Sequence, residues 1–306
     1  MPGRLLSAFV VIAALCLPRT LFAQFTDART YTQSPVGLNQ LELDYSHAHS
    51  NASIDTPFVI AGANFELNQV TASYTHDFGV LGHLAWVELA VPFARLSGAI
   101  AGTNISGSTT GTGDISLEFA GLLKGGRAFS AAELESYQAT TVVGLSLTIT
   151  APTGQYDADK LLNLGSNRWS FKPEIAVSYP FGRDEKWELD GYLNVYFFTD
   201  NTAYKGVEIL RQEALPGIEV HLSYSFTSSL WASLDTRYCA RGVTWVDDAN
   251  QDDAQESFTL GSELYWSPDS HSSLGLVFAK AVLHTNAPAY TGVTLKYVYS
   301  WVHDSK

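Results

Sequence analysis

The sequence predicts an all-β fold, an up-and-down antiparallel transmembrane β-barrel of about 12 strands. Apolar and polar residues alternate in one segment after another, which is typical of strands with one face in an apolar medium and the other in water. Long and short connections also alternate along the chain. Beyond the N-terminus no stretch is long and apolar enough for a membrane helix, although 46% of the residues are hydrophobic. Such a chain can cross a membrane only as a closed barrel, because a closed barrel pairs every backbone group.

The N-terminal residues predict a secretory signal peptide. Arg4 precedes a mostly apolar run from Leu5 to Leu17, and the small residue Ala23 ends the segment. The run is shorter than the roughly 20 residues that a membrane helix needs, so a membrane anchor is disfavoured. We therefore expect a cleaved signal peptide at 1–23 and an outer-membrane β-barrel domain at 24–306.

Composition argues against two other classes of protein. Cleavage removes Cys16 and leaves Cys239 without a partner, so no intramolecular disulfide can hold the fold. It also removes Arg4 and Arg19, which leaves 18 − 2 = 16 basic residues against 31 acidic ones, a net charge of −15. This charge argues against nucleic acid as a partner and against charge-driven docking on an anionic membrane surface.

The predicted strands follow one another with the same alternation. In the third, Val87 and Leu89 flank Glu88, and the fifth sets Leu147 against Ser146. The second loses its alternation near Gln69, which predicts a β-bulge there. The strands are predicted at 37–49, 65–78, 83–96, 113–123, 139–150, 169–179, 186–198, 216–226, 230–240, 257–267, 272–284 and 290–302.

The connections indicate how the barrel is oriented. Short turns lie near Gly79 and at 181–184, 227–229 and 268–271, and long loops at 49–64, 97–113, 152–166, 200–213 and 242–256. Outer-membrane barrels have short periplasmic turns and longer extracellular loops. The connection 125–138 should be short and is not. Its Ser130 and Glu133 have the spacing of a capping box, which predicts a short periplasmic helix, with a disordered linker as the alternative.

The tryptophans predict aromatic girdles at the two membrane interfaces. Most lie at or near the ends of predicted strands, with Tyr and Phe beside them. The alternative is that they pack the core of a soluble protein. Their position at strand ends favours the girdles, which are predicted to contain Trp86, Trp169, Trp187, Trp231, Trp266 and Trp301.

The polar parity of the strands predicts the residues that face the lumen. These side chains carry charges of both signs, and an inward charge needs water or a partner because burying it alone is costly. We expect salt bridges across the lumen and a narrow passage rather than a wide pore. The predicted lining residues are Glu88, Glu118, Lys172, Glu174, Glu188, Asp190, Tyr192, Glu219, His221, Asp235, Arg237 and Glu263.

Lys172 receives a more specific prediction. A tight turn joins the sixth and seventh strands, so their inward residues should meet across the pair. Lys172 is therefore predicted to lie among the carboxylates of Glu174, Glu188 and Asp190.

A stretch in the middle of the chain resembles a known family. APTGQYDADKLLNLGSNRWSFKPEIAVSYPFG, followed by WELDGYLNVYFFTDN, is similar to the outer-membrane transporter family of the phenol meta-cleavage degradation pathway. The resemblance covers about the middle fifth of the chain. It implies a barrel for uptake of aromatic or other apolar compounds. The residues that match the family motif are Pro152, Gly154, Gly165, Asn167, Arg168, Trp169, Lys172, Pro173, Asp200 and Asn201.

No motif for catalysis, phosphate binding or a metal is present, so we expect no enzyme activity, cofactor or metal. His47 and His49 share a strand face and could bind a metal, but polar side chains at a solvated strand end explain them as well. His221 and Ser223 share an inward face without an identifiable third member.

The sequence thus predicts passive uptake of a small aromatic or apolar solute through the outer membrane. The alternatives are an outer-membrane hydrolytic or lipid-modifying enzyme and a structural barrel. Expected partners are outer-membrane lipid, the solute and the barrel-assembly machinery.

Overall fold

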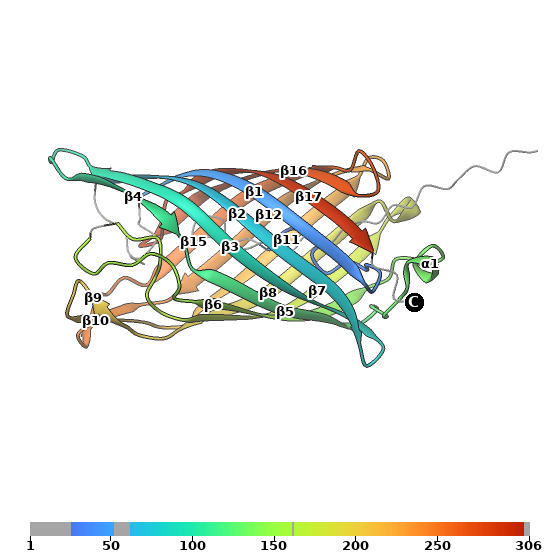
Figure 1. Cartoon of the computed structure of the whole chain (residues 1–306), viewed down its shortest axis with the longest axis horizontal. Coiled ribbons are helices and arrows are strands. Elements are labelled where there is room, and N and C mark those ends of the chain that lie inside the picture. Colours follow the sequence, from blue (N-terminus) through green and yellow to red (C-terminus); the bar gives the residue numbers. More distant parts are fainter. Residues whose placement is uncertain (1–25, 52–61, 161, 303–306) are drawn as a thin grey trace, which may run out of the picture.

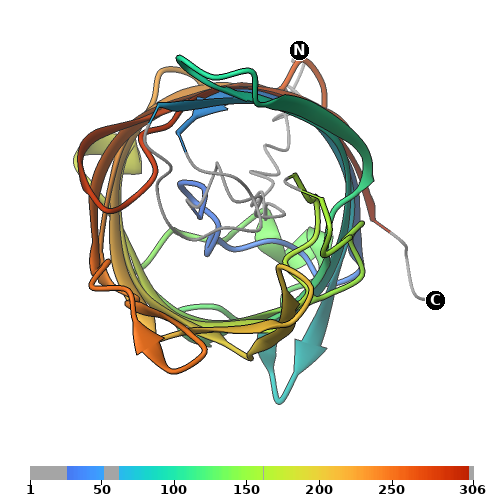
Figure 2. The ribbon, with the colours of Figure 1, turned by 90° about the vertical axis from the view of Figure 1, so that its left-hand side faces the viewer.

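The computed structural model describes residues 26–51, 62–160 and 162–302, so the signal peptide predicted at 1–23 lies outside the described residues. The chain forms a barrel whose strands run obliquely around a common axis (Figure 1). Seen along that axis, the strands make a closed ring (Figure 2). Among the described residues no helix has the length and apolar character needed to cross a membrane.

Twelve antiparallel strands form the wall, which confirms the predicted fold. Each strand pairs with its neighbours along the chain, and the first strand pairs with the last to close the ring. Leu38 lies opposite Val302 in this closing pair. The wall strands are β1 (Leu38–Ser50), β2 (Ala63–Val80), β3 (His83–Ile100), β5 (Ile115–Lys124), β6 (Val142–Ala151), β7 (Ser170–Phe181), β8 (Trp187–Phe198), β11 (Leu215–Ser225), β12 (Leu230–Arg241), β15 (Gln255–Trp266), β16 (Ser272–Thr285) and β17 (Thr291–Val302).

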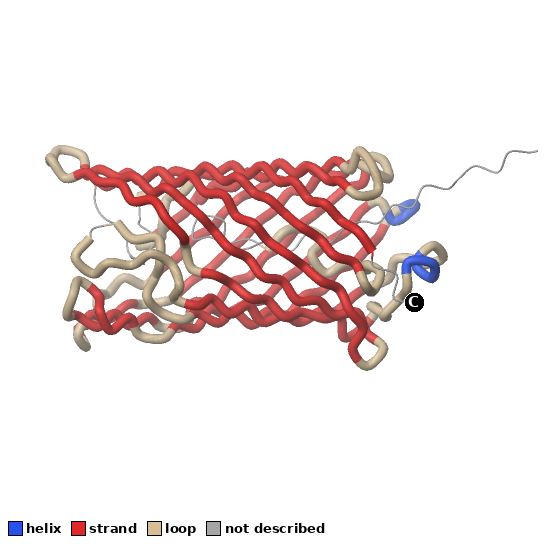
Figure 3. The backbone as a smooth tube through the Cα atoms, in the orientation of Figure 1, coloured by secondary structure: helices blue, strands red, loops and turns tan. Residues whose placement is uncertain are grey.

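The two ends of the barrel differ (Figure 3). Long connections gather at one end, which we call the loop end, and the other end, the turn end, carries the tight turns and the helical elements. β4 extends the wall at the loop end by pairing with β3, and four further short strands make a small separate sheet in the loops. The short elements are β4 (Ser106–Thr112), α1 (Ala131–Leu134), η1 (Arg183–Glu185), β9 (Asn201–Tyr204), β10 (Glu208–Gln212), β13 (Thr244–Val246) and β14 (Ala249–Asn250).

The helix predicted in the connection 125–138 is confirmed as α1. The backbone N–H of Glu133 donates to Ser130 Oγ at 3.4 Å, and the backbone N–H of Ser130 donates to Glu133 Oε2 at 2.8 Å. This reciprocal pair satisfies two donors that the start of a helix would otherwise leave without partners. The capping box therefore gives this long turn a defined structure.

The wall is apolar outside and polar inside. On β7, Ile175 is 44% exposed, whereas its neighbours Glu174 and Ala176 are buried. The same alternation runs along the other wall strands. The apolar side chains that dominate the outer face suit a lipid environment, and the alternation follows because successive side chains of a strand point to opposite faces.

The bulge predicted near Gln69 is wrong. β2 pairs with β1 and with β3 in continuous register through this residue. The alternation of apolar and polar residues breaks in the sequence because Phe65 and Leu67 are apolar and nevertheless point inward, where they are 3% and 1% exposed. The lumen is therefore apolar on this part of β2.

The girdle prediction is wrong for two tryptophans. Trp86 and Trp231 lie on the inward parity of β3 and β12; Trp86 is 3% exposed, and Trp231 stacks on the buried Tyr265 with ring centroids 4.6 Å apart. An indole that faces the lumen does not contact lipid. Its position near a strand end therefore does not indicate a membrane interface. The other four point outward as expected: Trp169, Trp187, Trp266 and Trp301.

Labelling of intact cells is expected to place the loop end outside. In a Cys239→Ser background, a cysteine at Gln251 in the loop after β14 should react with an impermeant maleimide. A cysteine at Ser270, in the turn between β15 and β16, should react only after the outer membrane is broken. Both positions are exposed, so accessibility of the side chain is matched. The opposite labelling pattern would reverse the orientation given by loop length.

Candidate functional site

The segment 26–34 precedes β1 and lies inside the barrel, where it appears as the blue segment within the ring of strands (Figure 2). We call it the lumen plug. Its residues 26–31 are at most 3% exposed. A turn folds it on itself, since Thr30 Oγ1 donates to the carbonyl of Asp27 at 2.9 Å and Arg29 has a positive φ of 64°. The first described residues of the chain thus occupy the lumen.

Arg29 attaches the lumen plug to β8 and β11. Its Nε donates to Ser223 Oγ at 2.7 Å and lies 3.6 Å from Glu188 Oε2. Its backbone N–H donates to Asp190 Oδ2 at 3.0 Å. The guanidinium also lies over the ring of Trp231, 4.8 Å from the centroid. A buried cation needs such partners, and here the wall supplies two carboxylates and an aromatic face.

Asp27 attaches the lumen plug to β15 and β17. Lys296 Nζ on β17 donates to Asp27 Oδ2 at 2.7 Å, and Tyr265 on β15 donates its hydroxyl to the same oxygen at 3.0 Å. Lys296 Nζ is also 4.0 Å from Glu42 Oε1 on β1. Lys296 is therefore the cation that joins the lumen plug to the closing strand pair.

Thr26 and Ala28 bind further wall carboxylates. The N–H of Thr26 donates to Glu219 Oε2 at 2.6 Å, and its Oγ1 donates to Glu174 Oε2 at 2.9 Å. Lys172 Nζ donates to Thr26 Oγ1 at 3.1 Å and to Glu174 Oε2 at 2.7 Å. The N–H of Ala28 donates to Glu263 Oε1 at 3.0 Å. Much of the predicted polar lining thus holds a segment of the same chain.

Tyr31 packs into an aromatic group on the wall. Its ring centroid is 5.6 Å from that of Trp86 and 5.3 Å from that of Tyr192. Its hydroxyl donates to Ser146 Oγ, or to Glu174 Oε1, at 2.9 Å. The ring approaches β6 so closely that a Cβ on Gly144 would lie 2.2 Å from it. Any side chain at position 144 would therefore clash with the ring of Tyr31.

All twelve predicted lining residues lie on the inward face, and of the contacts they make the sequence predicted only that between Lys172 and Glu174. Of those not yet placed, Glu118 Oε2 accepts from Thr148 Oγ1 at 2.7 Å, and Glu88 Oε2 accepts from Thr75 Oγ1 at 3.3 Å. Arg237 Nε is 3.6 Å from Glu219 Oε1.

The prediction that Lys172 lies among three carboxylates is wrong for two of them. Glu188 lies opposite Pro180 and Asp190 opposite Ser178, near the turn that joins β7 to β8, whereas Lys172 is at the far end of β7. Only the contact with Glu174 is present. Cross-strand partners in a hairpin are equidistant from the turn, and that spacing would have excluded both contacts.

Sequence reasoning missed five charged residues of the site. Glu42, Asp44 and Lys296 lie on inward parities that the alternation already marks, so they could have been included. Asp27 and Arg29 precede the first strand and show no periodicity. Nothing in their immediate sequence indicates that they enter the lumen.

The loop end of the lumen is apolar. A cluster of buried side chains from β1, β2, β3 and β16 meets two leucines of the loop 152–169 there. Because these residues lie on inward parities, they face the interior rather than lipid. We call this group the apolar cluster; its members are Ala48, Ala63, Phe65, Leu67, Ala94, Leu96, Leu162, Leu164, Ala279, Ala281 and Tyr290.

The residues of the family motif build the loop that carries those leucines. Gly154 and Gly165 touch, and a Cβ on Gly154 would lie 2.8 Å from Gly165 Cα. Asp114 joins the two ends of the loop, since its carboxylate accepts from the N–H of Gly154 and the N–H of Ser166, both at 2.8 Å. Pro152 follows directly after β6. The close glycine contact explains why side chains are excluded at both positions.

The remaining motif residues connect this loop to β8–β10 or lie on the outer face. Asn167 Nδ2 donates to Asn201 Oδ1 at 2.8 Å, and Arg168 Nη2 donates to Gln212 Oε1 at 2.7 Å. Burial lowers the pKa of Arg168 to about 10, so it stays protonated at neutral pH. Asp200 Oδ2 accepts from Arg211 Nε at 3.0 Å. Two motif residues, Trp169 and Pro173, point outward.

Comparison with solved structures identifies related barrels. A COG4313 outer membrane channel from Pseudomonas putida F1 aligns with a TM-score of 0.77 at 20% identity, over 90% of this chain and 100% of that one. The β domain of the Bordetella autotransporter BrkA aligns with a TM-score of 0.53 at 8% identity, over 87% of this chain and 100% of that one. The transport unit of the autotransporter AIDA-I from Escherichia coli aligns with a TM-score of 0.51 at 12% identity, over 91% and 94%. These likenesses agree on the fold.

Comparison of sequences gives the family. No curated protein sequence matches significantly. A sequence model of the family described as "Putative MetA-pathway of phenol degradation" matches residues 48–297, which include the loop built by the motif residues and the wall from the end of β1 to the middle of β17. The chain therefore belongs to this family.

Proposed function

We propose that the protein is an outer-membrane channel that passively admits a small aromatic or apolar solute. In this proposal the chain is exported with cleavage of residues 1–23, and 24–306 forms the barrel. The observation that carries the proposal is the apolar cluster at the loop end of the lumen. Apolar side chains on the inward parity attract apolar solutes, because the contact removes apolar surface from water.

The apolar cluster would act as the site of first capture. Phe65 and Leu67 point inward from β2, and Leu162 and Leu164 of the loop 152–169 pack in the same cluster. Transfer of apolar surface out of water is worth about 25 cal/mol per Å², so a monoaromatic solute that covers on the order of 100 Å² gains about 2.5 kcal/mol. This affinity is weak enough to permit release, as passive transport requires.

The family and the fold support a channel over an enzyme. The family description concerns phenol degradation, and one structural relative is itself an outer membrane channel. The hydrolase alternative needs Ser223 as a nucleophile beside His221. Ser223 Oγ instead accepts a hydrogen bond from Arg29 Nε at 2.7 Å, which withdraws electron density from the oxygen that would attack.

Interruption of the ion current in planar bilayers tests the proposal. Neutral aromatic solutes cross phospholipid unaided, so their entry into liposomes would not report on the protein. We expect phenol or toluene, added at the loop end, to interrupt the single-channel current at concentrations at which glycerol does not. The variant Phe65→Asp should weaken this block by roughly tenfold, because a charge in the cluster removes most of the transfer free energy.

The control is Val207→Asp, the same kind of change at a loop residue that is 87% exposed. It should leave the block unchanged. A barrel that conducts no ions would favour the structural alternative, and equal block by phenol and glycerol would contradict an apolar capture site.

A further inference from the structure

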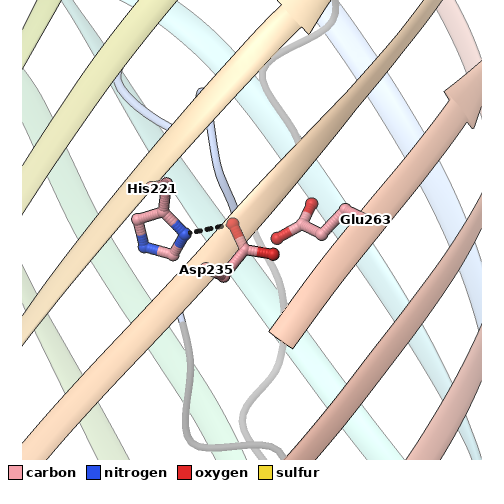
Figure 4. A group of neighbouring side chains, drawn as sticks. All are labelled: His221, Asp235 and Glu263. Carbon is pink, nitrogen blue, oxygen red and sulfur yellow. Dashed lines mark hydrogen bonds and ion pairs between the residues drawn. The ribbon is translucent and has the colours of Figure 1, made fainter. Parts of the chain in front are cut away.

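Three polar side chains on three adjacent wall strands meet inside the barrel (Figure 4). His221 on β11 lies directly opposite Asp235 on β12, and Glu263 on β15 lies opposite Ser233, one diagonal step from Asp235. Each of His221, Asp235 and Glu263 offers one ligand atom, and these atoms lie within 4.8 Å of one another. The barrel wall thus gathers an imidazole and two carboxylates at one level.

The contacts leave one of these oxygens without a donor. His221 Nδ1 lies 2.9 Å from Asp235 Oδ1, and Ser233 Oγ donates to Asp235 Oδ2 at 3.0 Å. Glu263 Oε1 accepts from the N–H of Ala28. Glu263 Oε2 is buried and has no hydrogen-bond partner among the described residues. A buried carboxylate oxygen without a donor is costly, so the position favours a bound cation or proton.

The neighbours keep the group ordered and leave space beside it. The ring of Tyr192 lies against His221, with centroids 5.0 Å apart, which holds the imidazole. Gly261 is the residue opposite Asp235, and a Cβ there would lie 3.3 Å from Asp235 Cβ and 3.6 Å from its Oδ2. Because residue 261 is a glycine, no side chain fills the space beside the carboxylate of Asp235.

The charge of the lumen also favours a cation. Among the described residues, the wall strands bury ten carboxylates and three lysine or arginine side chains. Lys296, the basic residue on β17, is bound to Asp27 of the lumen plug at 2.7 Å. The wall therefore carries an excess of negative charge, and attraction between a divalent cation and carboxylates is strong where water is scarce.

We propose that His221, Asp235 and Glu263 form a site for one divalent transition-metal cation, of the type of Zn²⁺ or Mn²⁺. One imidazole and two carboxylates are hard to intermediate ligands, which suit these ions and not Cu⁺. Two ligands at about 2.1 Å from an ion and at a right angle to each other are about 3.0 Å apart, close to the separation of His221 Nδ1 and Asp235 Oδ1. Glu263 completes the site through Oε2, the oxygen that has no hydrogen-bond partner among the described residues.

The site joins the wall to the lumen plug, because Glu263 also accepts the N–H of Ala28. The metal site does not depend on the solute, so a test of the metal site can fail without contradicting the channel function, and the reverse. A pair of histidines among the described residues competes for metal: His47 Nε2 and His49 Nε2 lie 3.2 Å apart on the outer face of β1. A metal bound by that pair has two imidazole ligands, whereas the proposed site has one. X-ray absorption can therefore distinguish the two sites.

Metal titration of the full-length protein in detergent tests the site. The protein is purified with a tag that has no histidine, stripped with EDTA and titrated with Co²⁺. We expect one Co²⁺ per chain, and X-ray absorption of the Zn²⁺ form should show one imidazole among oxygen ligands. Either His221→Gln or Glu263→Gln should weaken Co²⁺ binding at least about tenfold.

The double variant His47→Gln/His49→Gln is the control and should bind as the parent does. A chain that retains no ion, a zinc spectrum with two imidazoles, or binding that His221→Gln leaves unchanged would overturn the proposal. Glu263→Gln keeps the shape of the side chain, and the zinc spectrum needs no variant, so the test does not depend on the folding of His221→Gln.

Discussion

Replacing residues 26–33 with a glycine and serine segment of equal length is expected to raise the single-channel conductance several-fold. The lumen plug fills the middle of the barrel, and its residues 26–31 are almost fully buried. The replacement removes the Arg29 and Asp27 side chains that attach the segment to β8, β11, β15 and β17, so the segment can leave the ion path. A twelve-stranded barrel without the lumen plug is expected to have a single-channel conductance at least roughly threefold higher, because barrels of this size have a wide enough interior.

The same kind of replacement in the exposed segment 101–105 serves as the control, because these residues lie at the loop end outside the lumen. It should leave conductance unchanged. Equal conductance in the two replacements would show that the lumen plug does not limit the passage of ions, and the narrow passage would then have to lie elsewhere.

Lys296→Met is expected to lower the free energy of unfolding by about 3–5 kcal/mol. Lys296 Nζ binds Asp27 Oδ2 and lies near Glu42 Oε1, and its side chain is 1% exposed. Methionine nearly preserves the volume but removes the only buried cation described on β17, so Asp27, Glu42 and Asp44 face one another without compensation. Loss of one partner from a buried ion pair leaves the other charge desolvated, which is where the cost arises.

Urea unfolding of the protein in lipid vesicles, followed by tryptophan fluorescence and by the shift of the folded band on gels, measures this loss. Lys280→Met is the matched control, since Lys280 lies on the outward face of β16 and is exposed. It should change stability by less than about 1 kcal/mol. Equal stability of Lys296→Met and the parent would mean that the carboxylates around it are protonated in the folded protein.

The wall was predictable because its physical cause is local. Each strand has lipid on one face and the polar interior on the other. Apolar and polar residues therefore alternate with a period of two along the sequence. The prediction from alternation failed where the interior is apolar: Phe65 and Leu67 point inward, and alternation alone cannot distinguish an apolar lumen from lipid. The short strands β9, β10, β13 and β14 were not predicted because two to five residues are too few to show a period.

The lining of the site was predictable and its contacts were not. Parity assigns a side chain to a face, and this was correct for Lys172, His221 and Glu263. Contacts depend on register and on segments that enter from elsewhere. The distance to the turn would have shown that Lys172 cannot reach Glu188, whereas nothing local indicates that residues 26–34 fill the barrel.

The position of the lumen plug in the chain determines when it can form during folding. It directly precedes β1, yet its side chains bind β7, β8, β11, β15 and β17, up to 269 residues away in the sequence. Contacts of such separation form late, because the intervening chain must first lose its conformational entropy. Residues 26–34 are synthesised before every strand, but the full set of their partners is present only when β17, which carries Lys296, is in place. We therefore expect their attachment to be complete only when β1 and β17 pair, so that the step that closes the ring also completes its filling.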